Sequence, residues 1–195
     1  MQEWLLLVYK VPSEPTRYRA NVWRKLKAVG AVYLQHAVAA LPADAANERV
    51  LRGIVRDIRT MHGTAYLVRS TPVGDDTDLI DAFNAARAAE YREVLTRCLD
   101  FHAELARERQ AGKFTYAELE ENEADLHKLE VWLERLRARD RFGVPLGPAA
   151  AQAIAACRDD LAAFTAAVYR AVDHGSVGAT EDDPRDLRSK HDGPC

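Results

Sequence analysis

Strand- and helix-breaking residues divide the chain up to Pro72 into short segments, and this pattern constrains the fold more than any other feature of the sequence. Residues 3–11, EWLLLVYKV, are an apolar run that favours a half-buried pleated surface, and Pro12 ends it. The expected elements are a strand over 3–11, a helix over 15–29, two short strands or one bent strand over 31–41, a helix over 45–61 and a strand over 64–70. The order βαββαβ predicts a ferredoxin-like domain.

From Asp75 onward the pattern becomes helical. Thr115, with Glu118 three residues later, fits a capping box at the start of one of the helices. The expected helices span residues 77–110, residues 116–141, and residues from Pro148 to about Asp173. The sequence therefore predicts an α+β protein with a ferredoxin-like domain over 1–73, a helical domain of about three helices over 74–173, and a disordered tail over 174–195.

Composition excludes several classes of protein. No apolar stretch approaches the roughly 18 residues of a membrane span, and the N-terminus lacks the basic and apolar regions of a secretion signal. Cys98, Cys157 and Cys195 are odd in number, far apart, and form no C-x-x-C pair. This argues against a disulfide framework or a cysteine zinc site, and favours the reducing cytoplasm.

Charge is unevenly distributed along the chain. Residues 1–71 carry eleven Lys/Arg and five Asp/Glu, whereas residues 72–173 carry thirteen Lys/Arg and twenty Asp/Glu. A basic segment joined to an acidic one predicts two surfaces with different partners.

Both helices of the first domain have a cationic face opposite an apolar one. The predicted inward residues are Tyr18, Val22, Leu26 and Val29 on the first helix, and Val50, Ile54, Ile58 and Met61 on the second. The predicted outward cations are Arg17, Arg24, Lys27, Arg49, Arg52, Arg56 and Arg59. If both helices cover one face of the sheet, these cations are expected to lie side by side as one platform.

Such a platform suits the phosphates of DNA, although a solvated helix face also needs charge. Trp23, at the edge of the stripe, could stack on a base but more simply packs as an anchor. No homeodomain, zinc-finger, basic-zipper or helix-turn-helix pattern is present, so phosphate contacts are predicted rather than base contacts.

The acidic helices hold a possible metal site. Glu90 falls in the middle of an apolar stripe, where a carboxylate needs a partner. The candidate ligands are Glu90, Glu93, Glu120, Glu123 and His127. The alternative is that Glu90 forms a buried salt bridge with Arg87 or Arg97 and that the other carboxylates are solvated. A bound metal ion is thus an open alternative to having no cofactor.

No enzyme class is indicated by the sequence. It contains no Ser-His-Asp spacing, phosphate-binding glycine loop or dinucleotide fingerprint. His36, His62 and His102 lack the neighbours of a ligand set and are expected to be structural or surface residues. We therefore expect a protein without catalytic residues.

Three long blocks resemble the N-terminal domain of ChrB, a bacterial regulator of chromate resistance. They are WLLLVYKVPSEPTRYRANVWRKLKAVGAVYLQHAVAALP (4–42), AFNAARAAEYREVL (82–95) and FTYAELEENEADLHKLEVWLERLRARDRFG (114–143). The resemblance covers about residues 3–172. The first block also resembles the Cas2-like module of the PaaX phenylacetate regulators, which agrees with a ferredoxin-like domain.

The resemblance implies a chromate-responsive transcriptional regulator of an efflux operon. Full-length members of the family resemble this chain followed by a further chromate-resistance domain, which is where chromate chemistry would be expected. We expect a cytoplasmic, DNA-associated homodimer with no membrane contact. Two alternatives are a metal- or oxyanion-binding protein with its site in the helical bundle, and a dimeric interaction module that does not bind DNA. Because chromate is an anion, the basic stripes suit it better than the glutamates do.

Overall fold

The computed structural model describes residues 2–177, with side chains as far as Asp173. The chain forms two compact units: Met1–Leu95 with Val131–Ala151, and Thr96–Glu130 with the described residues from Gln152 onward. The domain boundary expected after residue 73 stays a prediction. In the expected tail, residues 174–177 are helical, which corrects its start, and residues 178–195 lie outside the described residues.

Four antiparallel strands form the sheet of the first unit. They are β1 (Trp4–Lys10), β2 (Val32–Gln35), β3 (Val38–Pro42) and β4 (Thr64–Ser70), in the order β2-β3-β1-β4. The first and last strands of the βαββαβ chain pair with each other, from Trp4 opposite Ser70 to Lys10 opposite Thr64. Of the two possibilities for residues 31–41, the two short strands are correct. The predicted α+β, ferredoxin-like fold is confirmed.

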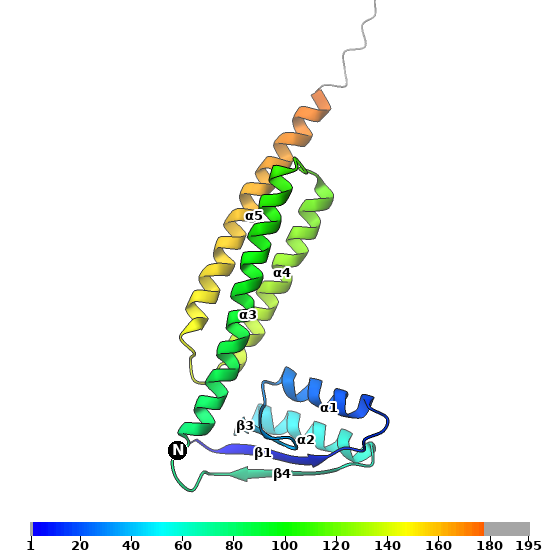
Figure 1. Cartoon of the computed structure of the whole chain (residues 1–195), viewed down its shortest axis with the longest axis vertical. Helices are drawn as coiled ribbons and strands as arrows, with labels where there is room; N and C mark the ends of the chain where they lie inside the picture. Colours follow the sequence, from blue (N-terminus) through cyan, green and yellow to red (C-terminus); the bar gives the residue numbers. More distant parts are fainter. Residues whose placement is uncertain (1, 178–195) are drawn as a thin grey trace, which may run out of the picture. The chain divides into compact units, whose positions relative to one another are not determined.

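Two helices, α1 (Arg17–Ala28) and α2 (Ala45–Thr60), cover one face of this sheet (Figure 1). The core between sheet and helices is apolar, and its fully buried members include Leu5, Leu7, Val22, Leu26, Leu41, Leu51, Ile54 and Ile58. The prediction that Val50 points inward is wrong, because its side chain is 40% exposed. The buried stripe of α2 instead includes Leu51 and Val55. At about 100° per residue, its four buried positions lie within about 50° of one direction on the helical wheel, and Val50 lies about 90° from that direction.

The opposite face of the sheet is covered only in part. At one end, the indole of Trp4 packs with the rings of Phe83 and Phe142, with ring centres 5.8 and 6.1 Å away. Along the same face, Val8 of β1 and Tyr66 of β4 lie opposite each other and are exposed. Val68, two residues further along β4, is exposed as well. This leaves an apolar strip on the open side of the sheet.

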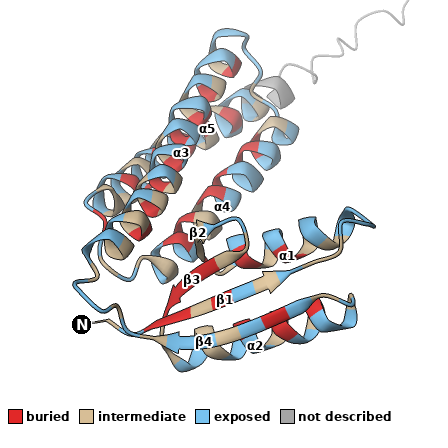
Figure 2. Cartoon of the chain, turned by 60° about the horizontal axis from the view of Figure 1, so that its bottom comes forward, coloured by how far each residue is buried: buried red, intermediate tan, exposed pale blue. Residues whose placement is uncertain are grey.

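The acidic part of the chain folds into three long helices, α3 (Thr77–Gln110), α4 (Tyr116–Arg139) and α5 (Leu146–Val177). As predicted, Thr115 caps α4, accepting a hydrogen bond from the Glu118 amide at 3.3 Å. One face of α4 is buried and is formed by leucines: Leu119, Leu126, Leu129, Leu133 and Leu136 (Figure 2). Within the described residues, no helix has the length and apolar character needed to cross a membrane.

Candidate nucleic-acid interface

The cationic face of α2 starts at a well-made helix end. The Asp44 carboxylate accepts a hydrogen bond from the Asn47 amide at 2.8 Å and so caps the helix. The apolar stripe then fixes the helix on the sheet, which leaves Arg49, Arg52, Arg56 and Arg59 exposed, as predicted. The same packing forces thus decide the direction of all four side chains.

Three of these arginines line a pocket of about 430 Å³ together with Arg69 of β4. Its floor is apolar, formed by Leu5, Val55 and Leu67. Among the described residues that line the pocket, Glu48 is the one carboxylate. We call Arg52, Arg56, Arg59 and Arg69 the arginine pocket.

Glu48 holds two of these arginines in place. Its carboxylate accepts from Arg52 at 2.5 Å and from Arg69 at 2.7 Å, and Arg69 also bonds Glu3 at 2.8 Å. The hydrogen bonds that Glu48 accepts, first from Arg52 and then from Arg69, lower the pKa of its carboxyl group. In the same way, the hydrogen bonds that Arg69 donates to Glu3 and to Glu48 raise the pKa of its guanidinium group. Arg56 forms no ion pair with any residue that the structure describes. The pocket therefore keeps a surplus of positive charge and free guanidinium donors.

The cations of α1 are separate from this pocket. Arg17, Arg24 and Lys27 are exposed, and the ammonium of Lys27 lies 5.2 Å from the centre of the Trp23 ring. The two helices are joined by the Lys25–Asp57 ion pair, with Nζ and Oδ2 2.6 Å apart. The arginine pocket is built by α2 with β4, so α2 gathers its cations with a strand residue rather than with α1.

Glu90 is bound to arginines rather than to a metal. Its carboxylate pairs with Arg87 and with Arg139, each at 2.7 Å. The same arginines donate to carbonyls at the end of α1: Arg87 to Gly30 at 3.0 Å, and Arg139 to Lys27 and Ala28. Cations suit the negative end of a helix dipole. Of the two salt-bridge partners expected for Glu90, Arg87 is confirmed.

The predicted carboxylate–histidine site is not assembled. Among the described residues, no three His, Cys, Asp or Glu side chains are placed to hold a metal ion. Glu93 belongs to the same unit as Glu90, while Glu120, Glu123 and His127 belong to the other unit. Glu120, Glu123 and His127 are exposed to solvent, as in the alternative of a solvated glutamate face.

His102 has neighbours that the sequence did not reveal. Its Nδ1 lies 2.6 Å from Oδ2 of Asp160, and its Nε2 lies 3.6 Å from the sulfur of Cys157. The set resembles a Cys-His-Asp catalytic arrangement, but the thiol is fully buried. Burial raises the pKa of Cys157 to about 12, so the thiolate needed for nucleophilic attack is scarce at neutral pH.

Sequence reasoning missed one residue of the arginine pocket. Arg69 lies in a strand and is separated from α2 by residues that form a turn, so no helical periodicity links it to Arg52. Its alternation with Leu67 and Ala65 on the helix-covered face of β4 was the available signal. Arg69 lies at the end of β4 on the face that α2 covers, so its side chain reaches α2.

Comparison with known families gives one match. The chain matches the family model described as "Protein ChrB, N-terminal" over residues 19–175, which is most of its length. The chain belongs to the ChrB N-terminal family. Membership associates it with regulators of chromate resistance. No curated protein and no solved structure is detectably similar to the chain. The likeness of the first block to the Cas2-like module of PaaX regulators stays a prediction.

Proposed function

We propose that this ChrB-family chain is a cytoplasmic, DNA-associated regulator of chromate resistance that holds the DNA backbone through its arginine pocket. The cations of α1 (Arg17, Arg24 and Lys27) and Arg49 of α2 extend the contact. The chain contributes no catalytic residue in this proposal. Base recognition is not part of it, since guanidinium groups facing phosphates carry no sequence information.

The observation that carries the proposal is the convergence of four guanidinium groups around one pocket with a single lining carboxylate among the described residues. Guanidinium groups bind phosphate through planar pairs of N–H donors, which lysine cannot match. A surface face that needed charge only for solubility would not gather arginines from two elements around a hollow. The ion pairs of Glu48 with Arg52 and Arg69 then orient the donors before a ligand arrives.

The test measures duplex DNA binding by fluorescence anisotropy across a range of salt concentrations. The double variant Arg52→Gln/Arg56→Gln should bind all sequences more weakly, and the slope of log affinity against log salt should fall by about 2, one for each arginine that no longer neutralises a phosphate. The matched control is Arg107→Gln/Lys128→Gln, which removes two exposed cations of α3 and α4. If the pocket variant and the wild type show the same affinity and slope, the DNA role is removed.

A third variant tests the other helix. Arg24→Ala/Lys27→Ala should weaken DNA binding across all sequences and flatten its salt dependence if α1 contributes phosphate contacts. Unchanged binding in this variant would confine the interface to the arginine pocket.

The size of the arginine pocket favours a second candidate ligand, a small tetrahedral oxyanion such as chromate. Four arginines around about 430 Å³ can surround a dianion as well as a backbone phosphate. Isothermal titration of the chain with chromate, and with sulfate as a non-oxidising dianion of the same shape, tests this. Binding of both anions that is abolished in Arg52→Gln/Arg56→Gln supports the oxyanion site.

We also propose that the chain is a homodimer through the open face of its sheet. The supporting observation is the exposed apolar strip of Val8, Tyr66 and Val68, with Tyr66 65% exposed. Light scattering on the wild type should give twice the chain mass, and Tyr66→Lys/Val68→Lys should give the monomer mass. A dimer that lacks any DNA affinity would instead indicate an interaction module.

A further inference from the structure

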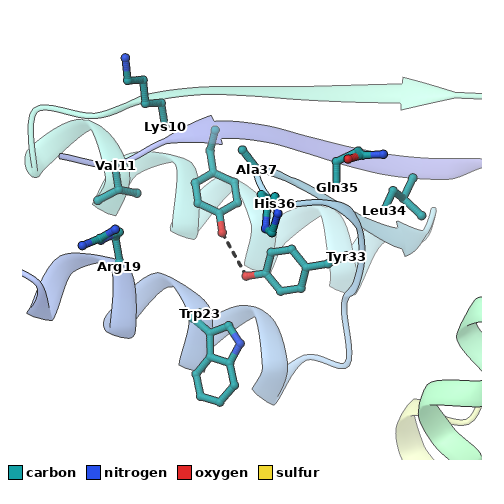
Figure 3. Close-up of a pocket in the computed structure, with 10 residues that line it drawn as sticks. Lys10, Val11, Arg19, Trp23, Tyr33, Leu34, Gln35, His36 and Ala37 are labelled. Atoms are coloured by element: carbon teal, nitrogen blue, oxygen red, sulfur yellow. Dashed lines mark hydrogen bonds between the residues drawn. The ribbon is translucent and has the colours of Figure 1, made fainter. Parts of the chain in front are cut away.

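A second pocket, of about 740 Å³, opens at the end of the sheet in the first unit (Figure 3). It is bounded by the end of β1, the turn between β2 and β3, and the first half of α1. Six of its lining residues carry a ring or a full positive charge: Tyr9, Tyr33, Trp23, His36, Lys10 and Arg19. Its volume falls in the range of pockets that take small organic ligands.

Trp23 supplies a half-exposed aromatic surface, with the ammonium of Lys27 over one face of its ring and the other face left for stacking. Its side chain is 49% exposed, so it is not the packing anchor that the sequence suggested. In Figure 3 the indole lies below the tyrosine pair, at the α1 side of the pocket. An exposed indole beside other rings is the usual platform for stacking a nucleobase.

Two tyrosines at the back of the pocket offer hydrogen bonds. The hydroxyls of Tyr9 and Tyr33 lie 3.0 Å apart, and either can be the donor. One of the two protons serves this bond, so the other is available to an acceptor in the pocket. Burial, followed by the hydrogen bond with Tyr9, raises the pKa of Tyr33 above the ordinary tyrosine value. Gln35 and His36 add further polar groups at the turn.

The charge of the pocket is positive. Arg19 and Lys10 line it, and its described lining residues include no Asp or Glu. The Lys10 side chain points away from the rings, so Arg19 is the cation on the ring side of the pocket (Figure 3). Arg19 uses one nitrogen, Nη2, for a weak bond to the Ser13 carbonyl at 3.3 Å. Its other N–H groups remain available to an anion.

From this combination we propose that the pocket binds a nucleotide. The base stacks on Trp23, the edge of the base meets the tyrosine hydroxyls and His36, and the phosphate is held by Arg19. The ligand can be a free nucleotide or an unpaired nucleotide of a single strand, because both present the same ring and phosphate. The proposal uses no residue of the arginine pocket and stands independently of it.

The experiment titrates the full chain with adenosine monophosphate, adenosine and a dT10 single strand by isothermal calorimetry. Trp23→Ala should weaken nucleotide binding about 5- to 100-fold, the range found for loss of one stacking side chain, while Trp23→Phe should retain most of it. Arg19→Gln should weaken binding of adenosine monophosphate but not of adenosine. Tyr169→Ala, which removes an exposed ring of α5 outside the pocket, is the control, and circular dichroism checks the fold of each variant.

Trp23-dependent binding of adenosine monophosphate identifies a free nucleotide as the ligand, and Trp23-dependent binding of dT10 alone identifies a strand. Either result supports the proposal. If the wild type binds neither ligand at millimolar concentration, or if Trp23→Ala binds both as well as the wild type does, the proposal is overturned. A failure here leaves the duplex binding of the arginine pocket intact, because that test uses different residues and a different ligand.

Discussion

The two compact units of this chain treat their charged side chains in different ways. In the sheet-containing unit, Glu90 is shared by Arg87 and Arg139, and these arginines also tie down the end of α1. In the second unit, the ion pairs that involve exposed side chains are mostly local or between neighbouring helices, as in Lys128–Asp125 and Arg158–Glu130. Both units have apolar cores, and the first adds a network in which one carboxylate, Glu90, holds two arginines that reach another element.

The same comparison supports the proposal that the binding surface lies on the basic segment rather than on the acidic one. Several carboxylates of α3 and α4 form ion pairs with nearby cations, such as Glu104 with Arg107 and Glu118 with Lys113. α2 carries four arginines and two carboxylates, and Arg52 alone among these arginines forms an ion pair with a described residue, Glu48. The other carboxylate, Asp57, pairs with Lys25 of α1. Positive charge left without a partner inside the molecule is available to an external anion.

The largest expected difference between the units is in the stability lost when a glycine with positive φ is replaced by alanine, and Gly30 is the example in the first unit. Its φ is +77°, and a Cβ added there would collide with Nη1 of Arg87. Gly30→Ala should lower the free energy of unfolding by about 3 kcal/mol, because it adds backbone strain and displaces a buried arginine. The control is Gly112→Ala in the second unit, where φ is +65° but no atom lies within 4 Å. It should lose about 1 kcal/mol in the same urea unfolding experiment. Equal losses would contradict the contrast.

The next contrast is between two ion pairs. Glu90→Gln leaves Arg87 and Arg139 close together without their shared counter-charge, and should destabilise the protein by about 2 kcal/mol. Glu130→Gln breaks the more exposed pair with Arg158 and should lose about 0.5 kcal/mol. Chemical denaturation of both variants checks this. A larger loss for Glu130→Gln would show that the second unit also depends on polar contacts.

A buried carboxyl in the second unit gives a smaller effect of opposite sign. Burial raises the pKa of Glu108, although a hydrogen bond from Asn122 at 2.7 Å opposes this. Since its folded pKa lies above the unfolded value, stability falls as pH rises through the folded pKa. Glu108→Gln should therefore stabilise the protein at pH 7, by about 1 kcal/mol, and reduce that decline. Melting temperatures from pH 4 to pH 8 test it, with exposed Glu121→Gln as the control. A lower melting temperature for Glu108→Gln at pH 7 would refute the assignment.

Helix caps give the smallest contrast. Asp44 caps α2 with a bond of 2.8 Å to the Asn47 amide and a second bond to its side chain, whereas Thr115 caps α4 with one bond of 3.3 Å. Asp44→Ala should lose about 1 kcal/mol and Thr115→Ala about 0.5 kcal/mol. Thermal unfolding followed by circular dichroism measures both, and the reverse order would contradict the comparison of cap geometries.

Much of the fold was predictable because its signals are local. The strand at Trp4–Lys10 and the helix at Thr77–Gln110 follow from apolar runs and from the glycines and prolines that end them. The prediction that Val50 points inward was wrong because α2 has apolar residues on more than one side, and the helical wheel alone does not show which side packs on the sheet. The prediction of a metal site was wrong because the spacing of glutamates along the chain cannot show that the carboxylate of Glu90 binds Arg139, which is 49 residues away.

The sequence by itself determined the order of strands and helices, the direction of the cations on α2, and the family to which the chain belongs. Tertiary structure alone decided that Arg69 joins those cations, that Glu90 binds two arginines, and that Trp23 stays open beside two tyrosines. The physical reason is one of range. Periodicity and capping act over a few residues and can be read along the chain, whereas a pocket depends on how separate elements dock.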